Sequence, residues 1–345
     1  MQGGTEMSGI VKVEGRRWLV PLLSLVLLAN FGAGSGDLRI VEATKTGDAA
    51  TIRALVKDRV DVNVPEPDGA TALHWASHRD DLETADLLIR AGARVNAVND
   101  YGITPLHLAC TNGSAAMVEK LLKAGANLRL VPSTGEAPLM TAVRTGKPDV
   151  VNVLLAHGAD VNAKEPSGQT ALMWAVGDDH LDIARLLIER GADVRARSTG
   201  GFTALLFAAR QGSVDAARTL LASGANVNET AADGSSALVV AVVRGHAPLA
   251  IFLLNQGADP NADGSGYTAL HWTVSYQEGE FTGDFGIFAE SGEWSALSGL
   301  QGAAKLELLN ALLAHGANPS ARLRKELPRW SAPVGIKRLP HVCCN

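Results

Sequence analysis

Histidine is the side chain in this sequence that most readily suggests a metal site. His74, His107 and His271 each follow a Thr-x-Leu triplet. Neutral imidazole is a common zinc ligand, but the ligands of a zinc site cluster closely. These three histidines occupy the same position in separate copies of one motif and show no such clustering. We therefore interpret them as structural members of the motif, and the sequence predicts no metal site.

A second group that could carry out acid–base chemistry is the run Asp178-Asp179-His180, followed by Asp182. Two carboxylates beside an imidazole could bind a cation or transfer protons. The run falls where a second helix is expected to begin, and carboxylates at a helix start are favoured by the helix dipole. We interpret the run as structural.

Aromatic and sulfur side chains give no clearer sign of chemistry. Trp75, Trp174 and Trp272 share one position in the repeated motif, where they would form either a stacking surface or, as we prefer, part of the core. Cys110 aligns with small apolar residues and is expected to be buried. No G-x-S-x-G, H-E-x-x-H or phosphate-loop motif occurs in a supporting context. The sequence predicts no catalytic residue, no cofactor and no enzyme.

The elements that position these residues follow a strict period. Six strings of the form G-A-x-x-x recur at steps of 33 residues, and a Thr-x-Leu-like triplet recurs at the same period, in each case two residues after a glycine. The strings are GARVN, GANLR, GADVN, GADVR, GANVN and GADPN, beginning at Gly92, Gly125, Gly158, Gly191, Gly224 and Gly257. A fixed period of this length indicates a repeat array.

Each unit predicts a short helix, a turn, a second helix and a loop. Thr or Ser caps the first helix, and Pro or Ala occupies its first turn. Leu73 and Ala76 begin the buried stripe of one such helix. A glycine such as Gly113 separates it from a second helix, predicted at 118–125, that stops at Gly125. The segment up to the next triplet is rich in turn residues and predicts a hairpin loop.

The period, the T-[AP]-L-H triplets and the G-A-[DN]-x-N strings resemble the ankyrin repeat. The run Thr104-Pro105-Leu106-His107 matches the family motif, and the resemblance covers about residues 37–322. It implies an all-α repeat solenoid of about eight stacked helix-turn-helix units with hairpin loops. The first unit, from Asp37, lacks the triplet and is similar to an N-terminal capping repeat.

The eighth unit is interrupted. Gly257 and Gly316 are 59 residues apart, so about 27 residues, 276–302, are inserted between the two helices of that unit. The segment contains five acids, no Lys or Arg, and five of the sixteen aromatic residues. Long insertions in compact arrays are often functional. It either binds a ligand through its aromatic residues or folds over the end of the stack as a cap.

Both ends of the chain differ from the repeats. Residues 1–36 combine Lys12, Arg16 and Arg17, twelve mostly apolar residues from Trp18, and small residues up to Gly36. This order predicts a signal peptide and therefore export to the periplasm or the exterior. Residues 323–345 form a basic, Pro-containing tail that we expect to be disordered or truncated.

The resemblance implies a non-catalytic scaffold that binds a protein or peptide on the face formed by hairpin tips and first helices. With 31 Lys and Arg against 36 Asp and Glu, no nucleic-acid partner is expected, and membrane contact is expected only transiently, through the signal segment. Two alternatives are a small-ligand or carbohydrate-binding module centred on the insertion and an accessory domain of a longer protein. Candidate binding residues are Asp68, Asp100, Tyr101, Lys164, Glu165, Asp233 and Tyr267 in hairpins, His78, Arg79, Arg144, Arg210 and Arg244 at first helices, and Phe281, Phe285, Phe288 and Trp294 in the insertion.

Overall fold

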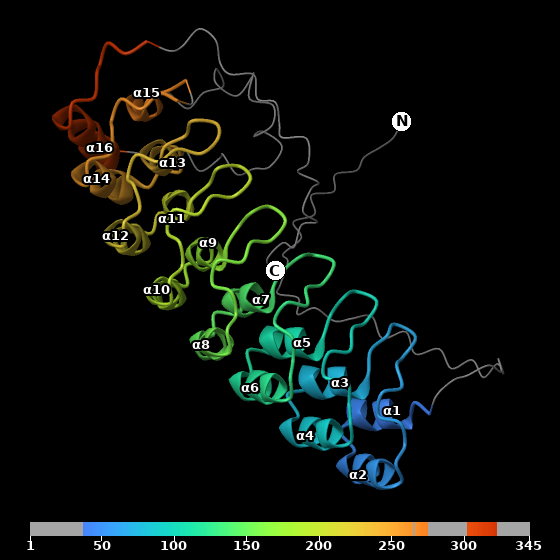
Figure 1. Ribbon diagram of the computed structural model, residues 1–345. Helices are drawn as coiled ribbons and strands as arrows, with labels where there is room; N and C mark the ends of the chain where they lie inside the picture. Colours follow the sequence, from blue (N-terminus) through green and yellow to red (C-terminus); the bar gives the residue numbers. More distant parts are fainter. Residues whose placement is uncertain (1–36, 265, 275–301, 323–345) are drawn as a thin grey trace, which may run out of the picture. The chain divides into compact units, whose positions relative to one another are not determined.

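The computed structural model describes residues 37–264, 266–274 and 302–322. These residues form eight pairs of short antiparallel helices joined by loops (Figure 1). The pairs are α1 (Arg39–Thr46) and α2 (Ala49–Lys57), α3 (Ala72–His78) and α4 (Leu82–Arg90), α5 (Pro105–Asn112) and α6 (Ala115–Lys123), α7 (Pro138–Arg144) and α8 (Pro148–Ala156), α9 (Ala171–Gly177) and α10 (Leu181–Glu189), α11 (Ala204–Gln211) and α12 (Val214–Ala222), α13 (Ala237–Val243) and α14 (Ala247–Asn255), and α15 (Ala269–Val274) and α16 (Gly302–Ala314).

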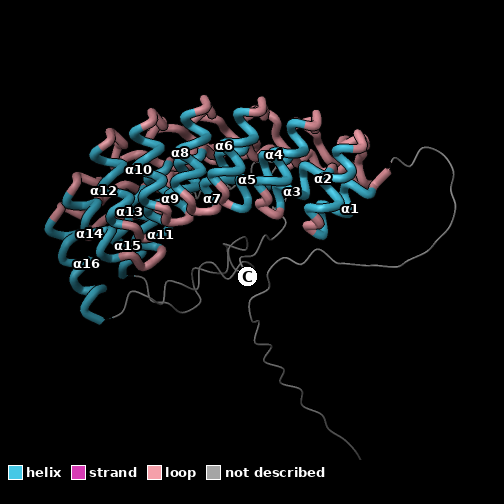
Figure 2. The backbone as a smooth tube through the Cα atoms, turned by 90° about the horizontal axis from the view of Figure 1, so that it is seen from below, coloured by secondary structure: helices cyan, strands magenta, loops and turns pink. Residues whose placement is uncertain are grey.

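The helices form two layers. Each odd-numbered helix packs on the next odd-numbered helix, and the even-numbered helices form a second, parallel row (Figures 1 and 2). The predicted all-α repeat solenoid is therefore confirmed. Within the described ranges the loops contain no strand, only isolated bridges such as Lys164 with Thr170. None of the helices in these ranges is long and apolar enough to cross a membrane.

Hydrogen bonds at the helix starts explain why several first helices begin at the Thr-x-Leu triplet. The Thr104 hydroxyl accepts from the backbone N–H of His107, while His107 Nδ1 accepts from the Thr104 N–H at 3.3 Å. This reciprocal capping box satisfies two donors that the first turn of a helix leaves free. Several second helices also begin after a side-chain cap. For example, α6 follows Ser114, whose hydroxyl accepts from the Met117 N–H. The helix predicted at 118–125 therefore begins three residues earlier, at Ala115, and ends at Lys123.

The core lies between the two layers. Leu73 and Ala76 are fully buried, as the periodicity predicts, and Leu88 of the second helix packs in the same cluster. Among the residues that the structure describes, three that are not glycine, Arg59, Asp80 and Asp179, adopt the left-handed conformation at loop positions where other units have glycine. Each costs of the order of 1 kcal/mol relative to an unstrained residue, so these are local departures from the optimum for the repeat.

An asparagine in most loops ties that loop to the next. The Asn96 amide donates to the Gly125 carbonyl at 2.9 Å, and its carbonyl oxygen accepts from the Asn127 N–H at 2.7 Å. The same pair of bonds joins Asn63, Asn162, Asn228 and Asn261 to the following loop. Asn261 reaches Gly316, 55 positions along the chain instead of the usual 29. The eighth unit is therefore completed by α16.

The hairpin tips are joined by a second set of bonds. Asp100 N–H donates to the Asp68 carbonyl at 2.9 Å, and Thr199 and Ala232 make the same bond to their preceding loops. One junction lacks both sets within the described chain, the junction between loops 124–137 and 157–170. Arg129 stands where the tying asparagine would be, and Pro166, which stands at the donor position, has no N–H. Helix packing, the contact of Arg144 with the Trp174 ring and the hydrogen bond from Arg190 to Asn152 join the fourth and fifth units.

Candidate interaction face

The odd-numbered helices and the loop tips beside them form one face, here called the first-helix face. One position on these helices projects toward it in successive units, occupied by Trp75, Leu108, Thr141, Trp174, Phe207, Val240 and Trp272. Six of these side chains are partly buried, whereas Thr141 is buried. The three tryptophans pack against the core along one side, as the preferred interpretation required, and remain partly accessible on the other.

The predicted residues at the ends of the first helices lie at this face. His78, Arg79, Arg144 and Arg210 are exposed, and Arg244 is half-buried. Several are already engaged: Arg79 donates to the Lys45 carbonyl at 2.9 Å, and the Arg210 carbonyl accepts from His246 at 3.1 Å. The Arg79 guanidinium is therefore held in place by the neighbouring unit.

The predicted hairpin residues divide into two groups. Asp100, Lys164 and Tyr101 are exposed, and Tyr101 shows 65% of its surface. The carboxylates of Asp68, Glu165 and Asp233 instead accept hydrogen bonds from residues of their own turns, for example Ser235 N–H to Asp233 at 2.9 Å. These three side chains therefore stabilise their loops. The residue type alone does not show whether an acidic loop residue has this role or binds a partner.

Tyr267 differs from the other hairpin residues. It is only 9% exposed and packs against the rings of His271 and Trp272, with centroids 6.4 and 5.4 Å away. It contributes to the interior of the last unit. Phe281, Phe285, Phe288 and Trp294, like the rest of segment 276–301, lie outside the described residues, whereas Gly302 is the first residue of α16. The predicted signal peptide 1–36 and the tail 323–345 also lie outside them.

A charged constellation, here called the Trp75 step, joins the first and second units. The Glu66 carboxylate accepts from the Trp75 indole Nε1–H at 2.5 Å and pairs with the Lys45 ammonium, which lies 4.9 Å from the Trp75 ring centroid. Lys45 also pairs with Glu42 at 3.3 Å. Burial lowers the pKa of Lys45, but the bonds to Glu66 and Glu42 outweigh it and raise the pKa overall.

The same residue positions recur 99 residues later, as Arg144, Glu165 and Trp174, here called the Trp174 step. The Arg144 guanidinium lies 5.9 Å from the Trp174 ring centroid and pairs with Glu136 at 3.2 Å. Glu165 is turned into its own loop, and the buried Trp174 Nε1 has no hydrogen-bond partner. The pairing of the two steps was not predicted from the sequence. The threefold multiple of the period that separates them was the available signal.

The repeated histidines are structural. His74 Nδ1 accepts from the Thr71 N–H at 3.1 Å and its Nε2 donates to the Ile103 carbonyl at 3.1 Å. His107 is 3% exposed, and burial, only partly offset by the Glu136 carbonyl, lowers its pKa to about 4. Burial also raises the pKa of the Cys110 thiol. Among the described residues no group of three or more His, Cys, Asp or Glu is placed to hold a metal ion.

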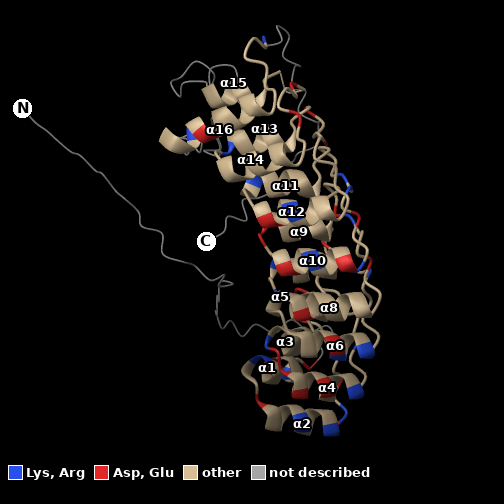
Figure 3. Cartoon of the chain, turned by 90° about the vertical axis from the view of Figure 1, so that its left-hand side faces the viewer, with Lys and Arg blue, Asp and Glu red and all other residues tan. Residues whose placement is uncertain are grey.

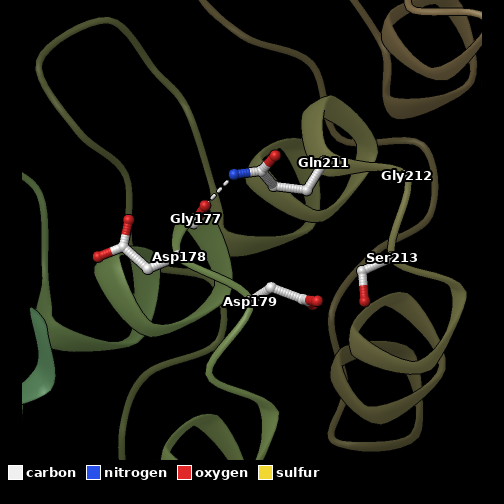
Figure 4. A pocket seen from close by; sticks show the side chains of 6 residues that line it. All are labelled: Gly177, Asp178, Asp179, Gln211, Gly212 and Ser213. Carbon is white, nitrogen blue, oxygen red and sulfur yellow. Dashed lines mark hydrogen bonds between the residues drawn. The ribbon is translucent and has the colours of Figure 1, made fainter. Parts of the chain in front are cut away.

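A pocket of about 380 Å³ lies between the fifth and sixth units (Figure 4). It is lined by Gly177, Asp178, Asp179, Gln211, Gly212 and Ser213. The Gln211 amide donates to the Gly177 carbonyl across it, and Asp178 points away from Asp179. Burial raises the pKa of Asp178, while His180 and Arg144 act against this shift. His180 is the N-cap of α10 and Asp182 lies in its first turn, as predicted, but Asp178 is the C-cap of α9, so the helix-dipole explanation applies to Asp182 and not to Asp178.

The even-numbered helices carry a different pattern of charge. Basic and acidic residues recur along α2, α4, α6 and α10 (Figure 3). Several pair between neighbouring units, as Lys120 does with Asp86 at 3.1 Å and His157 with Glu119 at 2.9 Å. Exposed pairs of this kind contribute only about 0–1 kcal/mol each. Charge on this side is largely balanced within the array.

Comparison with known proteins agrees with this architecture. A family model described as "Ankyrin repeats (3 copies)" matches residues 24–99, 40–131, 79–165 and 139–231, and one described as "Ankyrin repeat" matches residues 233–264. The chain belongs to the ankyrin repeat family. The chain is similar to the human ASB11 ankyrin repeat domain, whose crystal structure matches it with a TM-score of 0.57 and 32% sequence identity. The match covers 64% of this chain and 98% of that one. A search of curated proteins found no match. Ankyrin repeat domains typically mediate protein–protein interactions and are generally non-catalytic.

Proposed function

We propose that this ankyrin array is a non-catalytic scaffold that binds a protein or peptide on its first-helix face. The observation that carries the proposal is the continuity of the accessible groups there. Tip-to-tip hydrogen bonds hold most of the loops in a row beside the half-buried side chains of the odd-numbered helices. Exposed Tyr101 lies at this edge, and interface hot spots are enriched in Tyr, Trp and Arg.

The opposite surface supports the same choice. Charged groups on the even-numbered helices pair with each other between units, so fewer remain to meet a partner. The first-helix face combines apolar surface with guanidinium and carboxylate groups, which suits a mixed peptide surface better than a uniformly charged polymer. We propose a protein or peptide partner and no nucleic acid.

Affinity capture with matched variants tests this proposal. The double variant Tyr101→Ala/Lys164→Ala removes two exposed groups of the face, and Arg90→Ala/Lys123→Ala removes two exposed groups of the even-numbered helices. We expect the first variant to lose captured proteins or peptides that the wild-type chain and the second variant retain. Equal capture by all three chains would contradict the proposed face.

We also propose that the chain is exported, on the basis of the basic, apolar and small-residue order of residues 1–36. Expression of the full chain followed by cell fractionation and N-terminal sequencing tests this. Recovery of an exported chain that begins near residue 37 is the expected result, and recovery of the intact chain inside the cell would contradict it.

A further inference from the structure

The Trp75 and Trp174 steps are two copies of one arrangement. In each, a basic residue at the end of a first helix lies over the tryptophan of the next unit, and a glutamate follows at the same loop position. Lys45, Glu66 and Trp75 correspond residue by residue to Arg144, Glu165 and Trp174. The Trp75 step therefore shows which group binds the basic side chain and the indole N–H when both have hydrogen-bond partners.

At the Trp75 step the satisfying group is a carboxylate. Glu66 bridges the ammonium of Lys45 and the indole N–H of Trp75, although Lys45 is already paired with Glu42. A cation with one acidic partner thus holds a second carboxylate here. Hydrogen bonds between ionised groups are shorter and stronger than neutral ones.

At the Trp174 step the corresponding glutamate is used elsewhere. Glu165 accepts from the N–H groups of Ser167 and Gln169, at 2.8 and 3.0 Å. Arg144 keeps one acidic partner, Glu136, as Lys45 keeps Glu42. The Trp174 Nε1–H is buried and has no hydrogen-bond partner. Such a donor has lost its bond to water without gaining another, which costs free energy.

We propose that the Trp174 step binds a carboxylate of the partner, from an Asp or Glu side chain or a C-terminus, between the Arg144 guanidinium and the Trp174 indole N–H. This inference rests on the proposed peptide-binding function of the face. The carboxylate would take the place that Glu66 holds at the Trp75 step. A guanidinium has five N–H donors, so Arg144 can hold Glu136 and a second carboxylate at once.

Access and charge at the step are compatible with this ligand. Arg144 is 44% exposed on a flexible side chain that lies over the Trp174 ring, so its guanidinium can be reached by a partner and can shift when a carboxylate approaches the indole N–H. The charged or titratable groups near it are Glu136, Glu165, Asp178 and His180. Burial raises the pKa of Asp178, and attraction to His180 and Arg144 acts against this shift. The surrounding loops, 124–137 and 157–170, are also the two that no hydrogen bond ties together, which leaves room for local adjustment.

Selection from a phage-displayed library of random peptides on the full chain tests the inference. We expect enrichment of peptides with an Asp, Glu or free C-terminus at a fixed place. Synthetic peptides in which that group is replaced by an amide should bind the wild-type chain at least tenfold more weakly. With Trp174→Phe or Arg144→Gln the acid and amide forms should differ by less than twofold. Trp75→Phe, whose partner Glu66 is internal, is the matched control and should keep the tenfold difference.

The outcomes separate this inference from the proposed function. Some selected peptides could lose binding in Tyr101→Ala/Lys164→Ala, and so bind the face, yet show no acid preference. That result would contradict the carboxylate site but not the proposed scaffold function. An acid preference that persists in both Trp174→Phe and Arg144→Gln would also overturn it. If no selected peptide depends on the face, both proposals fail. Circular dichroism of each variant establishes that it is folded, and the exposed Arg144 substitution provides the test if Trp174→Phe unfolds.

Discussion

Protonation of His107 should couple the stability of the array to pH. In the folded chain the neutral imidazole accepts from the Thr104 N–H within a site that is 3% exposed, and burial lowers its pKa from 6.5 to about 4. In the unfolded chain the side chain titrates at its ordinary value. Because the unfolded state binds the proton more tightly, the stability contribution is complete above pH 6.5 and is lost as the pH falls toward 4.

The size of the effect follows from the two pKa values. A difference of 2.5 units corresponds to about 3 kcal/mol at low pH, and about 2 kcal/mol of this is already lost at pH 5. This is large for a marginally stable fold. His74, whose pKa is also lowered by burial, acts in the same direction.

Urea denaturation at pH 7.5, 6.5, 5.5 and 5.0 measures the effect, with His107→Gln as the decisive variant. Glutamine keeps an acceptor for the Thr104 N–H but has no proton to gain. Between pH 7.5 and 5.0 the free energy of unfolding should fall by about 2 kcal/mol more for the wild-type chain than for His107→Gln. Exposed His78 provides the control, since His78→Gln should retain the wild-type pH dependence. An identical pH dependence for wild type and His107→Gln would refute the reasoning, as would an NMR titration of His107 near pH 6.5.

Three further substitutions test the packing of the array by chemical denaturation. Asn162→Ala removes both bonds to the following loop and should cost about 1–3 kcal/mol, so unchanged stability would contradict the role of the asparagine ties. Glu229→Ala should raise stability by about 1 kcal/mol, because Oε2 is buried without a partner where most other units have Ala, and a loss would show that the carboxylate is useful. Gly212→Ala should cost more than about 1 kcal/mol, since φ is +79° and a Cβ would lie 2.5 Å from the His246 ring. The added variant His246→Ser should relieve the steric part, and strictly additive effects in the double-mutant cycle would argue against a clash.

The sequence predicted the repeated elements well because local chemistry determines them. Thr caps, first-turn Pro or Ala and buried Leu all act within a few residues, so the starts of the first helices follow from the triplets. The start of α6 was wrong because Ser114, and not the apolar run at Val118, determines where the N–H groups are capped.

The orientation of polar loop side chains was harder to predict. Asp68 and Asp100 have the same side chain in the loops of neighbouring units, yet one accepts from its own turn and the other is exposed. The choice depends on backbone N–H groups that become available only when the loop closes. The buried position of Tyr267 depends likewise on His271 and Trp272, which pack on it only in the folded last unit.

The junction at Arg129 and Pro166 has a mechanical consequence. The tying hydrogen bonds make most neighbouring loops resist separation together. Between loops 124–137 and 157–170 these bonds are absent, and separation is opposed by helix packing, the Arg144–Trp174 contact and the Arg190–Asn152 hydrogen bond. Hydrogen bonds depend steeply on distance and angle, so a small displacement of the loops breaks them. Apolar contacts are not directional and tolerate a small displacement better. We therefore expect the array to behave as two stiff segments joined by a compliant element, so that a pulling force is first absorbed between the fourth and fifth units.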